Sequence, residues 1–123
     1  MSAAGMYKAF LFSVDDGVAT VKFNRPEQLN ALTFETYREL GDMAYDLRED
    51  DDVRVVVFSG SGKGFCSGGD VQDIMGKLIT ADSRQLVAFQ RMAGRATKGL
   101  FNIRKPTIAA VNGIAAGAGA VIA

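Results

Sequence analysis

Two segments of the sequence repeat one pattern, in which a short apolar strand leads directly into a glycine-rich loop. The first is VRVVVFS at residues 53–59, followed by GSGKGFCSGGD at 60–70. The second is TIAAV at 107–111, followed by NGIAAGAGAVIA at 112–123. Nearly continuous runs of apolar, β-branched residues are typical of strands covered on both faces. Each loop also leads toward a helix, so both segments fit the strand–loop–helix units of an α/β fold.

Two further strands are expected near the start of the chain. Residues 8–14 (KAFLFSV) and 17–24 (GVATVKFN) are rich in β-branched and aromatic residues, and an Asp-Asp-Gly turn signal joins them. Pro26 follows the second strand and cannot donate to a β-ladder. These features predict a β-hairpin that precedes the two strand–loop units.

Three helices are expected between the strands. The first begins after a Thr33 N-cap, and its apolar face recurs at helical spacing at Phe34, Tyr37, Leu40, Ala44 and Leu47. Asp70 is the expected N-cap of the second helix, and a longer third helix is expected to start near Asp82. The buried side of the third helix is expected at Leu86, Phe89, Ala93, Ala96 and Leu100. The order β-β-α-β-α-α-β predicts an α/β fold with a partly parallel sheet.

The composition argues against several classes of function. Basic and acidic residues number 14 each, so the net charge is zero and favours neither nucleic acid nor an anionic membrane as a partner. The chain has no histidine, the commonest metal ligand, and we expect no metal site. Its one cysteine, Cys66, is expected to be a small buried apolar residue. The amino terminus is a poor secretory signal and residues 107–123 are too few to span a bilayer, so we expect a soluble, cytoplasmic protein.

Two superficial nucleotide-binding motifs fail on inspection. GSGKG at 60–64 lacks the first glycine of a phosphate loop, because Val57 stands there, and Gly64 replaces the required Ser or Thr. GAG at 117–119 lacks the third glycine of a dinucleotide fingerprint, because that position is Ile122. Neither loop therefore predicts a nucleotide.

Two interpretations of the glycine-rich loops remain, and the pattern alone fits both equally. In one, the glycines permit tight packing of helix on strand. In the other, the loops lie side by side at the carboxyl ends of neighbouring strands, where open α/β sheets bind ligands. Two backbone N–H groups, one from each loop, would then donate to one oxygen and stabilise an oxyanion.

Three segments in order and spacing resemble the enoyl-CoA hydratase/isomerase (crotonase) superfamily. They are NRPEQLNAL at 24–32, GKGFCSGGDV at 62–71 and KPTIAAVNGIAAGAG at 105–119, and the resemblance covers residues 7–123. It implies a crotonase-like β-β-α spiral of which only the first turns are present. Residues 1–123 would form the amino-terminal half of a single domain. The resemblance also implies trimers or hexamers in the intact protein.

The resemblance assigns candidate site residues. The two oxyanion donors would be the backbone N–H groups of Gly69 and of Ala118, the middle residue of a Gly-Ala-Gly triplet. Asp70 is expected to cap its helix rather than to do chemistry. Coenzyme A enters as part of an acyl-CoA thioester substrate, with no separate cofactor. The residues expected to contact CoA or substrate are Gln28, Leu29, Ala31, Ser67, Gly68, Asp70, Val71 and Gly117.

One position departs from the hydratases of that superfamily. Val121 stands where they carry an acid/base glutamate, and valine neither accepts nor donates a proton. Asp73, the nearest spare carboxylate, is expected to be an exposed charge in the first helical turn. We therefore expect an isomerase or another enolate-forming enzyme rather than a two-glutamate hydratase, and an inactive chain in isolation. The alternative is a non-catalytic acyl-CoA binder or assembly partner that needs a second chain.

Overall fold

The computed structural model describes residues 7–123, and they begin with the expected hairpin. Strands β1 (Phe10–Asp15) and β2 (Val18–Phe23) pair antiparallel, with Phe10 opposite Phe23. The turn between them places both Asp16 and Gly17 at positive φ, 49° and 80°. This geometry matches the right-handed twist of the flanking strands, which is why the Asp-Gly signal predicted it correctly.

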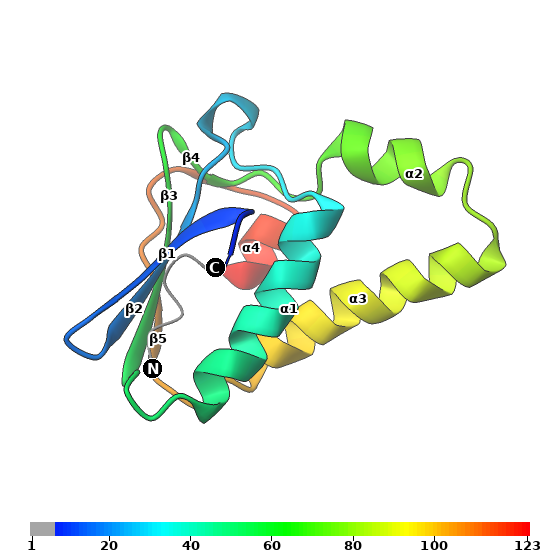
Figure 1. The fold of residues 1–123 in the computed structure, drawn as a ribbon. Coiled ribbons are helices and arrows are strands. Elements are labelled where there is room, and N and C mark those ends of the chain that lie inside the picture. Colours follow the sequence, from blue (N-terminus) through cyan, green and yellow to red (C-terminus); the bar gives the residue numbers. More distant parts are fainter. Residues whose placement is uncertain (1–6) are drawn as a thin grey trace.

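The hairpin is one edge of a mixed four-stranded sheet. Strand β3 (Val55–Gly60) runs parallel to β2, and β5 (Thr107–Ala109) runs parallel to β3, which gives the order β1-β2-β3-β5. Strands β4 (Gly64–Cys66) and β6 (Ile114–Ala115) form a second, two-stranded parallel sheet beyond the ends of β3 and β5. The partly parallel α/β sheet is confirmed, and Figure 1 shows the hairpin and the parallel strands in one layer.

Helices cover one face of this sheet. Helix α1 (Phe34–Glu49) lies against the sheet, and the carboxyl-terminal part of α3 (Ser83–Phe101) packs against α1 (Figure 1). Shorter elements are the 3₁₀ turn η1 (Pro26–Gln28), the π turn η2 (Val71–Met75), α2 (Gly76–Leu78) and α4 (Ala118–Ile122). Within residues 7–123, no helix combines the length and apolar character needed to cross a membrane.

The expected N-caps Thr33 and Asp70 are confirmed, and the third helix starts at Asp82 as expected, with Asp82 as its N-cap. The side chains of Thr33, Asp70 and Asp82 each accept a hydrogen bond from the backbone N–H three residues further on. Each such bond satisfies a donor that the first turn of a helix leaves unpaired. The helix starts were therefore predictable from short stretches of sequence.

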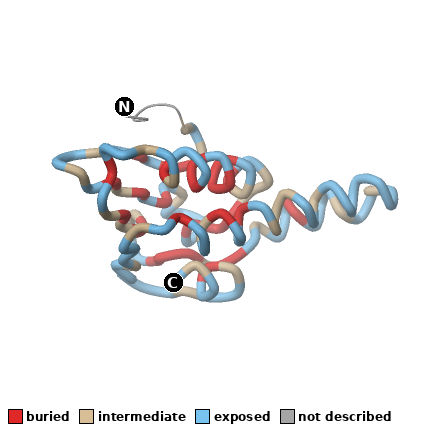
Figure 2. Tube along the Cα trace, turned by 90° about the horizontal axis from the view of Figure 1, so that it is seen from below, coloured by how far each residue is buried: buried red, intermediate tan, exposed pale blue. Residues whose placement is uncertain are grey.

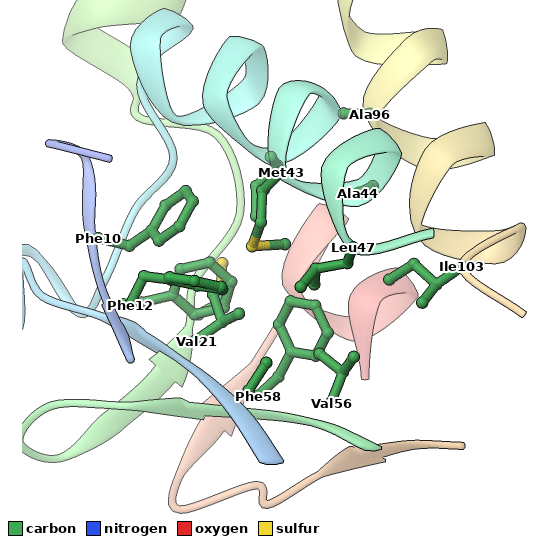
Figure 3. Packing of buried hydrophobic residues seen from close by; sticks show 14 of the residues in the cluster. Phe10, Phe12, Val21, Met43, Ala44, Leu47, Val56, Phe58, Ala96 and Ile103 are labelled. Carbon is green, nitrogen blue, oxygen red and sulfur yellow. The ribbon is translucent and has the colours of Figure 1, made fainter. Parts of the chain in front are cut away.

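The core lies between α1 and the sheet. Leu40, Met43, Ala44 and Leu47 of α1 are fully buried against strand residues such as Val21. Figure 3 shows Met43 and Leu47 directed at the rings and branched side chains of the sheet. Cys66 is buried and free, as expected for a small apolar residue. This packing positions the ends of β3 and β5, where the two glycine-rich loops begin.

The predicted buried face of α3 is wrong over its first half. Leu86 is 41% exposed, and only Ala96 of the five predicted residues is fully buried. Figure 2 shows the amino-terminal half of α3 extending beyond the rest of the molecule. The apolar spacing is present there, but within residues 7–123 only Phe89 packs on aromatic rings of α1, and Leu86 stays largely exposed.

The prediction that both apolar strands are covered on two faces is also wrong. In β3, Val56 and Phe58 are buried while Val55 and Val57 are only partly so. Strand β5 is at the sheet edge, and Ile108 is 53% exposed. The helices cover a single face of this sheet. A strand made of successive apolar residues therefore buries only the side chains that point to that face.

Replacing Leu40 tests the position of the core. We expect Leu40→Ala to lower the free energy of unfolding by about 2–5 kcal/mol, because it removes a fully buried side chain and leaves a cavity. The matched control is Leu86→Ala, which we expect to stay within about 0.5 kcal/mol of the unchanged protein. Urea denaturation followed by circular dichroism measures both, and equal losses would contradict the assigned packing.

Candidate functional site

Two asparagines hold the first glycine-rich loop. Asn30 is 1% exposed, and its Nδ2 donates to the carbonyl oxygens of Ser61 and Gly64 at 3.0 and 2.8 Å. Asn112 donates from Nδ2 to the carbonyl oxygens of Gly62 and Gly64 at 3.0 and 3.1 Å. These side chains come from opposite ends of the sequence and join at the Gly64 carbonyl. The loop is therefore fixed by side-chain hydrogen bonds, the Asn30–Gly64 bond being buried, as well as by the strands it joins.

The NRPEQLNAL segment lies directly beside this loop. Leu29 and Asn30 both have positive φ, 51° and 58°, which turns the chain back after η1. The Ser67 N–H donates to the Leu29 carbonyl at 3.0 Å, and the Leu32 N–H donates to the Gly68 carbonyl at 2.7 Å. Gln28, Leu29 and Ala31 are thus brought next to Ser67 and Gly68, although nearly 40 residues separate them in sequence.

The second glycine-rich loop lies against the first through backbone contacts. The Ala116 N–H donates to the Cys66 carbonyl at 3.0 Å. A Cβ on Gly119 would lie only 2.0 Å from that same carbonyl oxygen, so a side chain cannot fit there. A Cβ on Gly68 would lie 3.1 Å from the Ala116 carbonyl oxygen and 3.7 Å from the Ala118 nitrogen. Glycine is needed because two backbones approach closely.

Each loop includes a backbone N–H that has no partner in the described residues. Across residues 7–123, no acceptor is hydrogen-bonded to the N–H of Gly69 or of Ala118. The next N–H along each loop is paired, because the Asp70 N–H donates to the Leu32 carbonyl and the Gly119 N–H donates to the Ala116 carbonyl. Backbone donors normally find partners in a folded protein. Two unpaired donors on adjoining loops are therefore available to a ligand.

An apolar cavity of about 510 Å³ adjoins the second loop. It lies between α1, the carboxyl-terminal half of α3, β3, β5 and α4. Both Ala118 and Val121 are among its lining residues, and Val121 is 73% exposed. The described lining residues are Tyr37, Leu40, Phe58, Ala93, Ala96, Thr97, Leu100, Phe101, Thr107, Ala118, Val121 and Ile122. None of these residues carries a carboxylate, and most of their exposed surface is hydrocarbon.

Asp70 has a structural position, as expected. Its Oδ1 accepts from the Asp73 N–H at 2.9 Å, and its Oδ2 pairs with Arg25 Nη1 at 2.9 Å. The same Arg25 nitrogen donates to the Ala31 carbonyl at 2.8 Å. The Asp73 N–H, followed by Arg25, lowers the pKa of Asp70 below its usual value. Arg25 and Asp70 therefore join the NRPEQLNAL segment to the first loop.

Asp73 corrects one expectation. It is not simply an exposed charge, because its Oδ2 accepts from the Phe34 N–H at 2.9 Å and its Oδ1 pairs with Lys77 at 3.1 Å. The Phe34 N–H is the main cause that lowers the pKa of Asp73. The carboxylate thus helps cap α1 from another element, a role that the local sequence does not reveal.

Most candidate site residues lie in one region. Gly68, Gly69, Gly117 and Ala118 are together at the loop contact, with the 28–31 turn beside the first loop. Val71 is the least enclosed member, since its side chain is largely exposed on η2. Arg25, Asn30 and Asn112 were missed as site-forming residues. The αL conformation tolerated by asparagine was the available signal for Asn30.

A β-β-α arrangement with two adjoining glycine-rich loops at the ends of parallel strands defines the crotonase-like class of fold. The family model for enoyl-CoA hydratase/isomerase matches residues 13–123. The chain belongs to the enoyl-CoA hydratase/isomerase family.

Individual relatives agree with this assignment. The chain is 36% identical over 119 residues to a 1,2-epoxyphenylacetyl-CoA isomerase of Escherichia coli K12, covering 96% of this chain and 45% of the relative. It is 31% identical over 117 residues to a trans-2-decenoyl-[acyl-carrier-protein] isomerase of Streptococcus mutans, and the match covers 95% of this chain and 44% of the relative. A crystal structure assigned as an enoyl-CoA hydratase of Streptomyces coelicolor A3(2) superimposes with a TM-score of 0.90 at 45% identity. The superposition covers 94% of this chain and 42% of that structure's chain. The chain spans less than half the length of these proteins.

The loop contact is tested by adding one methyl group. Gly119→Ala would place a Cβ against the Cys66 carbonyl, and we expect it to cost about 1–3 kcal/mol of unfolding free energy. Gly94→Ala in α3 meets no atom within 4 Å and is expected to raise stability by about 0.5–1 kcal/mol, because alanine favours a helix. Thermal and urea unfolding of both variants measure the difference. Similar behaviour of the two would contradict the close backbone approach.

The Arg25–Asp70 pair is tested by its pH dependence. Asn at position 70 still caps a helix, so Asp70→Asn removes mainly the charge. Because the folded-state pKa of Asp70 is lowered, its charge stabilises the protein at neutral pH and that contribution is lost as the pH falls through the lowered pKa. We expect Asp70→Asn to be less stable than the unchanged protein near neutrality and equal to it in strongly acidic buffer. Urea midpoints across this range measure the gap, and a gap that widens with acid would contradict the assignment.

Proposed function

We propose that the chain forms part of an acyl-CoA thioester enzyme in which the backbone N–H groups of Gly69 and Ala118 stabilise a thioester enolate. The observation that carries the proposal is the pair of unpaired donors on adjoining loops, next to an apolar cavity lined by Ala118. Family membership supports it, and the E. coli relative is named for an acyl-CoA substrate. The cavity would receive the acyl group.

Forming a thioester enolate requires hydrogen-bond donors directed at one atom, the carbonyl oxygen of the thioester. Removing a proton next to a thioester carbonyl moves negative charge onto the carbonyl oxygen, and two N–H groups held in place stabilise that charge as it develops. Each donor of this kind is worth about 3–4 kcal/mol in the transition state. The Asn30 and Asn112 bonds keep the first loop rigid, which suits donors that must not reorganise during the reaction.

The 28–31 turn and the first loop would hold the CoA part of the substrate. In this proposal Gln28, Leu29 and Ala31 contact it from one side and Ser67 from the other, in agreement with the contact between these segments. The remaining substrate contacts are assigned to Gly68, Asp70, Val71 and Gly117. Asp70 acts through the Arg25 pair that joins the two segments.

The proposed reaction is an isomerisation or another enolate reaction rather than a two-glutamate hydration. Val121 carries no acid or base, and among the described residues the cavity lining contains no carboxylate. A group that moves the proton would come from outside this chain's cavity lining. We therefore expect no hydration of crotonyl-CoA by the 123-residue chain. A trimeric or hexameric assembly and a cytoplasmic location stay predictions, as does the division of residues 1–123 as the first part of one domain.

A pair of substitutions at Ala118 tests the donor assignment. Ala118 is the first residue of α4, a position where proline is compatible with a helix. Ala118→Pro removes the N–H, and we expect it to weaken acyl-CoA binding by about tenfold or more. Ala118→Gly keeps the N–H and is expected to bind as the unchanged chain does.

Isothermal titration with butyryl-CoA measures both variants, and circular dichroism establishes that each is folded. Equal affinity of the proline and glycine variants would contradict the role of the Ala118 N–H. Binding without conversion of any enoyl-CoA, even with the remaining length of the family domain supplied as a second chain, would favour the non-catalytic binder.

A further inference from the structure

The Tyr37 side chain brings a hydroxyl to the boundary between the cavity and the first loop. Tyr37 lies one turn into α1 and lines the cavity together with Ala118. Its hydroxyl oxygen is 3.6 Å from the point that a Cβ on Gly69 would occupy. One polar group of α1 therefore lies close to Gly69 of the first loop, and its side chain shares a cavity with Ala118 of the second loop.

This hydroxyl differs from the other two in the cavity lining. Thr97 Oγ1 donates to the Ala93 carbonyl at 3.0 Å, and Thr107 Oγ1 donates to the Lys105 carbonyl at 3.0 Å. No hydrogen bond joins the Tyr37 hydroxyl to any group in residues 7–123. No fully buried side-chain polar atom in that range lacks a partner, so the Tyr37 hydroxyl is accessible rather than sealed in the core, and the Tyr37 side chain lines the cavity.

Aromatic packing fixes the ring that carries the hydroxyl. The Tyr37 ring meets the Phe89 ring edge to face, with centroids 6.0 Å apart and planes at 88°. Phe89 in turn packs edge to face on Phe34, with centroids 4.8 Å apart. Contacts of this kind restrict a side chain without using its polar atom. The hydroxyl is therefore held at the cavity without a bond that would compete with a ligand.

We propose that the Tyr37 hydroxyl is a third hydrogen-bond donor to the acyl-thioester oxygen held by the Gly69 and Ala118 N–H groups. This inference rests on the proposed function of the two loops. The bond would form when the acyl group enters the cavity, and it would add to carbonyl polarisation and to the orientation of the acyl group. From the sequence, Tyr37 was predicted only to be one residue of the apolar face of its helix.

The protonation state of Tyr37 suits a donor. Burial raises the pKa of the Tyr37 hydroxyl above its usual value, and the neighbouring Cys66 thiol adds to the increase. The phenol therefore keeps its proton at neutral pH. In a largely apolar lining, a hydrogen bond to a developing negative charge is stronger than the same bond in water.

The experiment compares Tyr37→Phe with Tyr45→Phe in the 123-residue chain. Both changes remove one tyrosine hydroxyl from α1, but Tyr45 does not line this cavity. Cinnamoyl-CoA is the probe, because its conjugated thioester absorbs at longer wavelength when its carbonyl oxygen is polarised. Calorimetric titration gives its affinity, and the difference absorption spectrum of the bound probe gives the polarisation.

We expect Tyr37→Phe to bind cinnamoyl-CoA about three- to tenfold more weakly and to show a smaller red shift at saturation, while Tyr45→Phe matches the unchanged chain. An unchanged red shift in Tyr37→Phe would overturn the inference and leave the two-loop proposal standing. A failure of the unchanged chain to bind the probe would overturn both. Unfolding midpoints of the two variants separate a lost bond from a lost fold.

Discussion

The backbone contact between the two glycine-rich loops is the constraint on which the site depends. The Cys66 carbonyl accepts the Ala116 N–H and leaves no room for a side chain on Gly119, while Gly68 fits against Ala116 in the same way. The two interpretations of the glycines are therefore compatible. Glycines packed this tightly are also what brings Gly69 and Ala118 onto adjoining loops, each with a free N–H.

Polar side chains around the first loop keep that contact in place. Asn30 and Asn112 meet at the Gly64 carbonyl, and Arg25 with Asp70 joins the 28–31 turn to the start of η2. Each of these bonds links residues that are distant in sequence. The cost of burying the Asn30 side chain is offset because its amide is hydrogen-bonded. A site of backbone donors gains rigidity from such a network.

Local signals in the sequence were accurate, whereas predictions of what is buried were not. The Asp-Gly turn, the Thr33 and Asp70 caps and the helix start near Asp82 were predicted correctly, because their hydrogen bonds close within three or four residues. Burial of Leu86 and of β5 was predicted wrongly. The spacing of apolar residues indicates which face of an element is apolar, but it does not indicate whether another element covers that face. Asp73 was misjudged for the same reason, since its partner Phe34 lies on another element.

The sequence by itself determined the order of helices and strands, the helix starts and, through three motifs, the family to which the chain belongs. Only the tertiary structure decided that the two loops touch, that the Gly69 and Ala118 N–H groups have no partner among residues 7–123, and that the Tyr37 side chain lines the cavity. The physical reason is the range of the interactions. Turns and caps depend on neighbouring residues, whereas a cavity and its free donors depend on how distant backbones approach each other.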